Sequence, residues 1–253
     1  MQRCLDSISS QSFTDYVHIV VDPGSDDGSR DLILNSTSSQ LLPVFQRDSC
    51  APEGLNHGIA KATGEYVLFI NSDDCLVEGA LELTYNKLEE TCFPDILFMG
   101  GYIEDSTNSS RRRFFPGSTH GVIHALGLSQ FFQQGAVVKT DIVRQANGFN
   151  PTNRTCWDAE LFLQLLAKTD LRRSRCCDPI AIFVIHPESI TGSKRVQGQY
   201  LLDSERIVRT YYGNLIHNVR GFISICPWGL RILLKYLLDP ILALWRLSSF
   251  FAA

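Results

Sequence analysis

The chain has 253 residues, of which 44% are hydrophobic and 20% charged, and its formal net charge is −4. This composition is typical of a folded globular protein and argues against intrinsic disorder. The sequence pI of about 5.9 gives no general attraction to nucleic acid, so we expect no nucleic-acid partner.

Cysteine usage and hydropathy indicate a cytoplasmic protein. The eight cysteines are scattered without a C-x-x-C pair, which favours reduced thiols over a disulfide scaffold. The start, MQRCLD, has no apolar stretch, and no run of about 18 uncharged apolar residues occurs anywhere. We therefore expect neither a signal peptide nor a membrane-spanning helix.

Helix and strand patterns alternate over the first hundred residues. The predicted helices are 2–10, 29–35, 52–62 and 77–90, and the predicted strands are 16–21, 42–46, 66–70 and 96–102. Such alternation implies β-α-β units and an α/β fold with a mostly parallel sheet flanked by helices. Parallel strands are covered on both faces, which explains the continuous apolar runs YVHIVV and YVLFI.

The second half of the chain is less regular. Residues 104–121 form a polar, basic segment that predicts a loop, and 131–149 predicts a strand followed by a short helix. Residues 156–168 predict an amphipathic helix, 180–185 a strand and 201–212 a helix. The Arg111-Arg112-Arg113 run is either a solvated charge run or a contact for a phosphorylated acceptor.

An acidic turn ends the predicted strand 66–70. Asn71, Ser72, Asp73 and Asp74 follow Ile70 directly, and ligands of parallel sheets bind beyond this end of the strands. Adjacent carboxylates repel each other unless a cation compensates them, and the turn contains no basic residue. Oxygen ligands suit Mg²⁺ or Mn²⁺. The alternative is that one aspartate caps the helix beginning near Val77 while both remain solvated.

Several segments in order resemble the inverting family 2 glycosyltransferases of the GT-A fold. The family has a strand followed by Asp-x-x-Ser-x-Asp-Gly-Ser/Thr, and this chain has VVDPGSDDGS. It then has Asn-x-Gly-Ile and Ala-x-Gly-Glu before an Asp-x-Asp type motif, matched here by LNHGIAKATGEYVLFINSDD. Later segments are FFQQGAVV, ANGFN and CWDAELFLQL. The resemblance covers about residues 2–192 and implies a Rossmann-like GT-A fold and a nucleotide-sugar donor.

The resemblance assigns donor-side roles to three residues. Asp22 would contact the nucleotide base or ribose, although an aspartate before Gly24 can also simply form the turn. Asp48 and Asn56 would approach the base and pyrophosphate, and Asn56 could equally cap locally. We expect a UDP-sugar donor, with GDP- or dTDP-sugars as the alternatives.

The resemblance implies that the acidic turn of this chain holds a metal ion. Asp73 would be the main ligand of a Mg²⁺ or Mn²⁺ ion that bridges the donor diphosphate, and Asp74 would assist directly or through water. Asn71 stands where many members have the first Asp of the motif, and its amide oxygen is a weaker ligand than a carboxylate.

Asp158 would be the general base that takes the proton from the acceptor hydroxyl in an inverting transfer. We expect the helix dipole to keep it ionised. The alternative is an ordinary N-cap, in which case Glu160 would be the base. His186, in IHPESITGS, would reach a donor phosphate or the metal, or be structural. Gln134, next to Gly135, would hydrogen-bond a sugar hydroxyl.

These expectations define the predicted organisation. Residues 1–200 would form the GT-A domain, with a nucleotide-sugar half at about 1–103 and an acceptor half at about 104–200. The family's sheet opens with an apolar strand that precedes the helix at 2–10, and we expect this strand to lie upstream of the sequence or to be lacking. Residues 201–253 would form an apolar helical extension.

The apolar tail carries scattered cations. Residues 219–250, interrupted by Pro227 and Pro240, predict two short helices that either lie in a membrane interface or pack on the protein. We therefore expect a metal-dependent inverting glycosyltransferase, cytoplasmic or peripheral on the cytoplasmic membrane face. It would act on a saccharide or lipid-linked acceptor in surface polysaccharide or glycolipid synthesis. The rival hypothesis is a truncated or degenerate GT-A module that binds without catalysis.

Overall fold

The computed structural model describes residues 1–108, 110–187, 189 and 196–251. The helices are α1 (Gln2–Ser9), α2 (Ser29–Leu34), α3 (Ala51–Lys61), α4 (Ala80–Glu90), α5 (Gly121–Ala125), the 3-10 helix η1 (Gln133–Gly135), α6 (Thr140–Gln145), α7 (Trp157–Ala167), α8 (Gln197–Ile225), α9 (Trp228–Leu238) and α10 (Pro240–Phe251). The strands are β1 (His18–Asp22), β2 (Leu41–Phe45), β3 (Tyr66–Leu68), β4 (Cys75–Leu76), β5 (Ile96–Asp105), β6 (Ser110–Phe114), β7 (Ala136–Lys139) and β8 (Arg173–Ile185).

The strands form two sheets among the described residues. β1 and β2 pair in parallel, and the larger sheet has the order β3-β7-β5-β8-β4 with β6 paired to β5. Among the described strands of the larger sheet only β5 and β8 are parallel, so the expected mostly parallel sheet is wrong and the sheet is mixed. The connection from β5 to β6 is too short for a crossover and forces an antiparallel hairpin.

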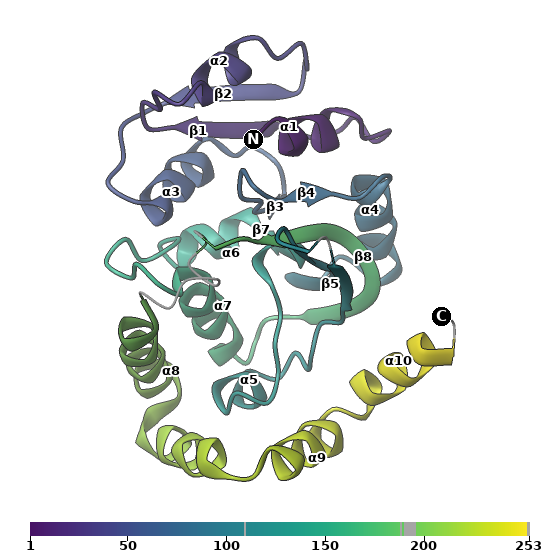
Figure 1. Cartoon of the computed structure of the whole chain (residues 1–253), viewed down its shortest axis with the longest axis vertical. Helices are drawn as coiled ribbons and strands as arrows, with labels where there is room; N and C mark the ends of the chain where they lie inside the picture. Colours follow the sequence, from purple (N-terminus) through teal and green to yellow (C-terminus); the bar gives the residue numbers. More distant parts are fainter. Residues whose placement is uncertain (109, 188, 190–195, 252–253) are drawn as a thin grey trace.

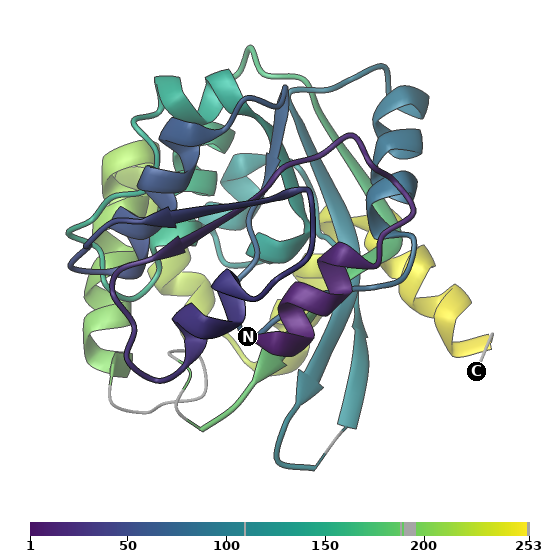
Figure 2. The ribbon, with the colours of Figure 1, turned by 90° about the horizontal axis from the view of Figure 1, so that it is seen from above.

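The larger sheet contains the main core. Ile96, Leu97, Phe98 and Met99 of β5 are at most 1% exposed because β7 and β8 flank the strand. Aromatic and aliphatic side chains of α6 and α7 pack on one side, and those of α1 and α4 belong to the cluster on the other. Figures 1 and 2 show helices on both faces of this sheet, as the apolar run ILFM predicts.

The smaller sheet lies at the end of the molecule that carries the N-terminus (Figure 1). Among the described strands, only β2 pairs with β1 and only β7 pairs with β3, so each has one unpaired edge. A cavity of about 1890 Å³ is lined by β1 and β3, by α1 and α3, and by the beginning of α7. Ile19 and Val67 are consequently only half-buried.

Three segments differ from their predictions. The predicted loop 104–121 is wrong, since it contains the end of β5, all of β6 and the beginning of α5. β6 is polar because its residues lie on the exposed edge of the sheet, where Arg111 pairs with Glu104. β8 begins at Arg173 rather than 180, and α8 runs from Gln197 to Ile225 with a kink at Gly213. The predicted boundary at residue 200 falls inside α8.

The tail forms the two predicted helices, α9 and α10. Pro227 is the N-cap of α9 and Pro240 begins α10, where a missing backbone N–H costs no helical hydrogen bond. Figure 1 shows α8, α9 and α10 along the end of the molecule opposite β1 and β2. None of the helices in the described part of the chain is long and apolar enough to cross a membrane. Residues 252–253 of the predicted extension lie outside the described residues.

Candidate active site

Asp74 is the centre of a buried polar network. It is 0% exposed, its Oδ1 accepts a 2.8 Å hydrogen bond from the Val184 backbone N–H, and its Oδ2 accepts a 3.0 Å bond from Asn71 Nδ2. Oδ2 also accepts a hydrogen bond from the buried Gln134 side chain. Asp74 therefore fastens the acidic turn to β8 and η1.

The alternative that an aspartate of this turn caps the next helix is wrong. That helix, α4, begins at Ala80 with Gly79 as its N-cap, and no side chain caps it. β4 separates the turn from α4 and pairs with β8. The acidic turn is thus held by strands and not by a helix end.

Burial raises the pKa of Asp74 to about 6. Desolvation is the largest cause, the hydrogen bond from the Val184 backbone N–H opposes it, and the neighbouring charge of Asp73 adds to the rise. The carboxylate is buried and bonded only to neutral donors, so a nearby cation would favour its ionised form.

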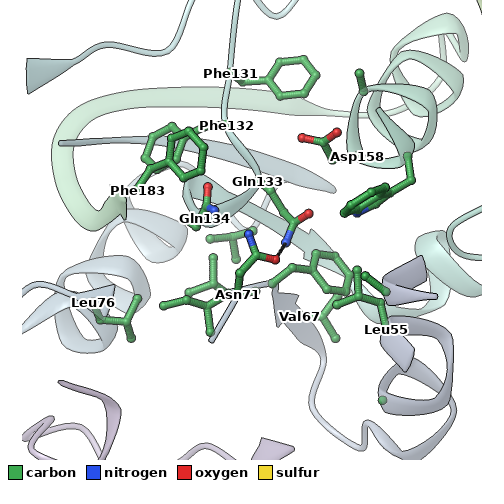
Figure 3. A pocket seen from close by; sticks show the side chains of 18 of the residues that line it. Leu55, Val67, Asn71, Leu76, Phe131, Phe132, Gln133, Gln134, Asp158 and Phe183 are labelled. Carbon is green, nitrogen blue, oxygen red and sulfur yellow. Dashed lines mark hydrogen bonds between the residues drawn. The ribbon is translucent and has the colours of Figure 1, made fainter. Parts of the chain in front are cut away.

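Asn71 is held by the side-chain amide of Gln133 in η1. Its Oδ1 accepts a 3.1 Å hydrogen bond from Gln133 Nε2, and Figure 3 shows both amides at the pocket with this bond dashed. The sequence prediction named Gln134 and missed Gln133. The signal was the QQ doublet itself, because two adjacent amides before a buried strand need two separate partners.

Asp73 and His186 form a pair at the mouth of the cavity. His186 Nε2 lies 3.0 Å from Asp73 Oδ2, and their side chains are 32% and 39% exposed. Both residues line the cavity. The structure therefore brings together Asp73, which lies between β3 and β4, and His186, which directly follows β8. Residues 188 and 190–193 of the predicted His186 segment lie outside the described residues.

Asp158 lies in the first turn of α7, and its carboxylate points into the pocket (Figure 3). The alternative N-cap reading is wrong, because Cys156 is the N-cap of α7. Burial raises the pKa of Asp158 and outweighs the backbone N–H groups of Ala159 and Asp158. Burial therefore opposes the ionised form that the start of the helix was expected to favour. The half-buried carboxylate shares its cavity with Asp73.

The Glu160 carboxylate binds Arg206 of α8. It is 4% exposed, and both carboxylate oxygens accept 2.8 Å hydrogen bonds from Arg206. Asn150 and Asn153 donate to the same carboxylate, and its pKa is lowered although burial opposes this. Glu160 does not line the cavity, so these contacts make it an anchor and not a second base.

Asp22 lies at the end of β1 and is 3% exposed. Its Oδ1 accepts a 3.0 Å hydrogen bond from the Ser25 backbone N–H, which is the turn-forming contact of the alternative reading. Its Oδ2 accepts no hydrogen bond from the described residues and lies 3.7 Å from Arg30 Nε. Burial raises the pKa of Asp22, but the bonds from Ser25 outweigh it and the net shift is downward. The carboxylate retains one unused acceptor.

Asp48 lies shortly before α3, and Asn56 lies within this helix. Asp48 lines the cavity, and its Oδ2 is 2.7 Å from where a Cβ on Gly54 would lie, so a side chain at position 54 would displace this carboxylate. Asn56 donates a 2.7 Å hydrogen bond to the Phe149 carbonyl and accepts a 2.8 Å bond from the Phe149 N–H. Both polar atoms of Asn56 thus hold the ANGFN turn against α3.

The described residues contain no cluster of three or more His, Cys, Asp or Glu side chains arranged to hold a metal ion. Asp73 and His186 offer two donors side by side, and Asn71 and Asp74 direct their polar atoms at each other and at glutamines. Two protein donors fit a cation that takes its remaining ligands from phosphate and water, as Mg²⁺ commonly does. They do not fit an all-protein metal cage.

The fold is similar to that of solved structures of S. aureus TarS. The crystal structure of S. aureus TarS 1–349 matches with a TM-score of 0.65 and 14% sequence identity, over 92% of this chain and 66% of that one. The structure of TarS 1–349 in complex with UDP-GlcNAc matches with a TM-score of 0.63 and 16% identity, over 82% and 61%. At these identities the comparison shows the fold alone, which is an α/β fold of the GT-A type.

The chain belongs to glycosyl transferase family 2, whose family model matches residues 1–145. Glycosyltransferase GlyA of Streptococcus pneumoniae is 28% identical over 52% of this chain and 18% of its own length. A PGL/p-HBAD biosynthesis glycosyltransferase of Mycobacterium bovis is 31% identical over 43% of each chain. The GalNAc(5)-diNAcBac-PP-undecaprenol beta-1,3-glucosyltransferase of Campylobacter jejuni is 32% identical over 36% and 30%. The match thus spans less than half the length of these relatives.

Proposed function

We propose that the chain transfers a sugar, with inversion, from a nucleotide-sugar donor to a hydroxyl group of a saccharide or lipid-linked acceptor. A UDP-sugar is the first choice because TarS has been solved with UDP-GlcNAc, and GDP- and dTDP-sugars are the alternatives. The transfer would be a step in surface polysaccharide or glycolipid synthesis, as the names of the Campylobacter and Mycobacterium relatives suggest.

One observation supports this proposal above the others. The Asp158 carboxylate faces the cavity that Asp73 also lines, and burial raises its pKa. A general base works best when its pKa is closer to the working pH than that of a free carboxylate. In the proposal, Asp158 accepts the proton of the acceptor hydroxyl while that oxygen attacks the anomeric carbon.

The other residues take separate roles. Asp73 and His186 would hold a Mg²⁺ or Mn²⁺ ion together with the donor phosphates, and the ion would supply charge neutralisation at the leaving diphosphate. Asp22 is not among the residues that line the cavity, and in the proposal its unused Oδ2 would accept a hydrogen bond from the base or ribose. Asp48, which does line the cavity, would approach the base and pyrophosphate. Asp74 would position Asn71 and Gln134. We place the reaction in the cytoplasm, with α8–α10 toward the membrane face.

Ligand-induced thermal shifts test donor and metal binding. The full chain is heated with UDP-, GDP- and dTDP-sugars, each with and without Mn²⁺, and we expect the largest rise in Tm for a UDP-sugar with metal. Asp73→Ala should abolish the metal-dependent part of the rise. Asp141→Ala, at an 84% exposed carboxylate of α6, is the matched control. A chain that no nucleotide sugar stabilises in the presence of metal would contradict the proposal.

Turnover tests the base. We expect Asp158→Asn to lower kcat by about 10²–10⁴-fold while the donor-induced thermal shift remains, because the amide cannot accept the proton. The base must be deprotonated, so activity should fall as pH drops through the raised pKa of Asp158. Unchanged turnover in the variant would remove Asp158 from the mechanism.

The non-catalytic module keeps one observation in its favour. β1 and β3, which line the cavity, each have an unpaired edge among the described strands. A single assay distinguishes the two functions, in which donor binding and release of nucleoside diphosphate are measured with a panel of saccharide and lipid-linked acceptors. Donor binding without release of nucleoside diphosphate would favour the non-catalytic module.

A further inference from the structure

The C-terminal helices turn an apolar surface to solvent. We call the following exposed side chains the C-terminal face: Leu215, Val219, Phe222, Ile225, Trp228, Leu230, Leu233, Leu237, Leu238, Ile241, Leu244 and Leu247. They are more than half of the large apolar side chains that the structure describes as exposed, although they come from a short part of the chain. Such a concentration marks an interaction surface.

The exposed side chains follow helical spacing. Leu215, Val219 and Phe222 are at i, i+4 and i+7 on α8, and the same kind of stripe continues on α9 at Leu230, Leu233 and Leu237. A surface helix of a globular protein normally buries its apolar stripe. Here the stripe is outward, and no residue of α9 is buried.

Specific contacts hold these helices to the body of the protein. Two 2.7 Å hydrogen bonds join the Arg175 guanidinium of β8 to the Asp239 carboxylate between α9 and α10. Asp239 and Leu242 are each 1% exposed, and the Arg175 guanidinium lies 5.1 Å from the centroid of the Trp245 ring. The helices are therefore attached through their inner side, which leaves the apolar side outward.

The charge of this segment has one sign. Between residues 213 and 251 the sequence has the cations Arg220, Arg231, Lys235 and Arg246, and its one carboxylate, Asp239, is neutralised by Arg175. A second copy of the same face would bring cations against cations. Anionic lipid headgroups would meet cations, while the apolar side chains enter the acyl boundary and Trp228 sits at headgroup depth.

We propose that the C-terminal face docks the protein on the surface of an anionic phospholipid bilayer, with α9 and α10 lying in the plane of the interface. The apolar side chains supply the insertion, and the exposed cations Arg231 and Arg246 supply the preference for anionic lipid. The contact is peripheral.

The docked face borders the cavity of the candidate active site. The cavity that contains Asp158 is also lined by Tyr200 and Arg220 of α8 and by Arg231 of α9. An acceptor carried by the bilayer would approach Asp158 from this side, beside two cations that suit acceptor phosphates. This consequence rests on the proposed glycosyltransferase function, whereas the docking itself does not.

Vesicle co-sedimentation of the full chain tests the docking. The protein is mixed with vesicles of phosphatidylcholine alone, or with one third phosphatidylglycerol, at low and at high salt. We expect binding to the anionic vesicles, weaker binding at high salt and little binding to pure phosphatidylcholine. The assay needs neither donor nor turnover, so its failure is distinguishable from failure of the proposed function.

Matched variants separate insertion from charge. Phe222→Ser with Trp228→Ser should weaken binding by about tenfold or more, because both side chains are largely exposed and would lose insertion. Arg231→Gln should weaken binding to anionic vesicles by about fivefold and leave binding to phosphatidylcholine unchanged. Leu34→Ser, exposed on α2, and Lys61→Gln, exposed at the end of α3, are the controls and should bind like the parent. Circular dichroism checks that each variant is folded.

Three results would overturn the proposal. One is a parent chain that does not sediment with anionic vesicles. Another is a folded Phe222→Ser/Trp228→Ser variant that binds as well as the parent. The third is a dimer in solution that these same substitutions dissociate, since the occupant of the face would then be a second copy of the chain.

Discussion

The strands β5 and β3 have the same kind of sequence and different surroundings. Both begin as continuous apolar runs, ILFM and YVLFI, which predict strands covered on two faces. In β5, Ile96 and Leu97 are 0% exposed, whereas Tyr66, Val67 and Leu68 of β3 are all half-buried. An apolar run therefore predicts a strand more securely than it predicts how deeply the strand is buried.

Strand pairing explains the difference. β5 lies between β7 and β8 in the larger sheet, while only β7 among the described strands pairs with β3. Residues of both β3 and β1 line the cavity, and the acidic turn lies shortly after β3 in the chain. The candidate site thus lies at the boundary between a closed part of the fold and an open one.

The largest effect should come from the closed part. We expect Phe98→Ala in β5 to lower the free energy of unfolding by about 3–5 kcal/mol, because the ring is 1% exposed and contacts Phe131 and Phe162. Urea denaturation followed by circular dichroism measures the change. Phe45→Ala in β2, where the ring is 40% exposed, is the matched control and should cost about 1 kcal/mol or less. Equal losses would contradict the distinction between the two parts.

The second effect concerns the carboxylate that joins the two parts. Asp74→Asn replaces an acceptor of two amide N–H donors by a group that carries its own donors, so we expect unfolding free energy to fall by about 1–3 kcal/mol. Asp73→Asn, beside it and exposed, should change stability by about 0.5 kcal/mol or less. A similar cost for both would mean that the network does not hold the turn.

The same variant has a pH signature. Asp74 has a pKa of about 6 in the folded protein, above its unfolded value of about 4, so folding favours the protonated carboxyl. Its contribution to stability is fully present below the unfolded pKa and is lost as pH rises through the folded pKa. The stability difference between parent and Asp74→Asn should therefore change between about pH 4 and pH 6 and be flat above. Denaturation curves at several pH values measure it.

Sequence patterns predicted the helices and strands whose signals are local. The apolar run ILFM, the amphipathic 156–168 segment and the prolines of the tail each determine an element from their own residues. β6 escaped prediction because SRRRF is polar on an exposed edge, where pairing with β5 makes it a strand. The first half of β8, RSRCCDP, is half-buried and polar for the same reason.

The candidate site was predictable in its position and not in its contacts. The acidic turn, Asp22 and Asp158 were found from strand ends and motif order. Asp74 has one local partner, Asn71, but its other partners Gln134 and Val184 are 60 and 110 residues away, so no local pattern reveals them. The same holds for Asn56, whose two hydrogen bonds go to Phe149. Sequence therefore identifies polar residues near a site but not which of them are already paired.

The smallest and most closely matched test uses two neighbouring valines. Val67 of β3 and Val138 of β7 are directly paired in the antiparallel ladder, so a change in either acts on the same part of the sheet. Val138 is 0% exposed, and Val138→Ala should lower the free energy of unfolding by about 2 kcal/mol through lost burial and a residual cavity. Val67 is half-buried beside the open edge, so Val67→Ala should cost about 1 kcal/mol or less.

If a nucleotide sugar fills the neighbouring cavity, the gap in unfolding free energy between the two variants should narrow on its addition, because the ligand would cover Val67 and leave Val138 as it is. A gap that stays the same with saturating ligand would place the donor away from β3.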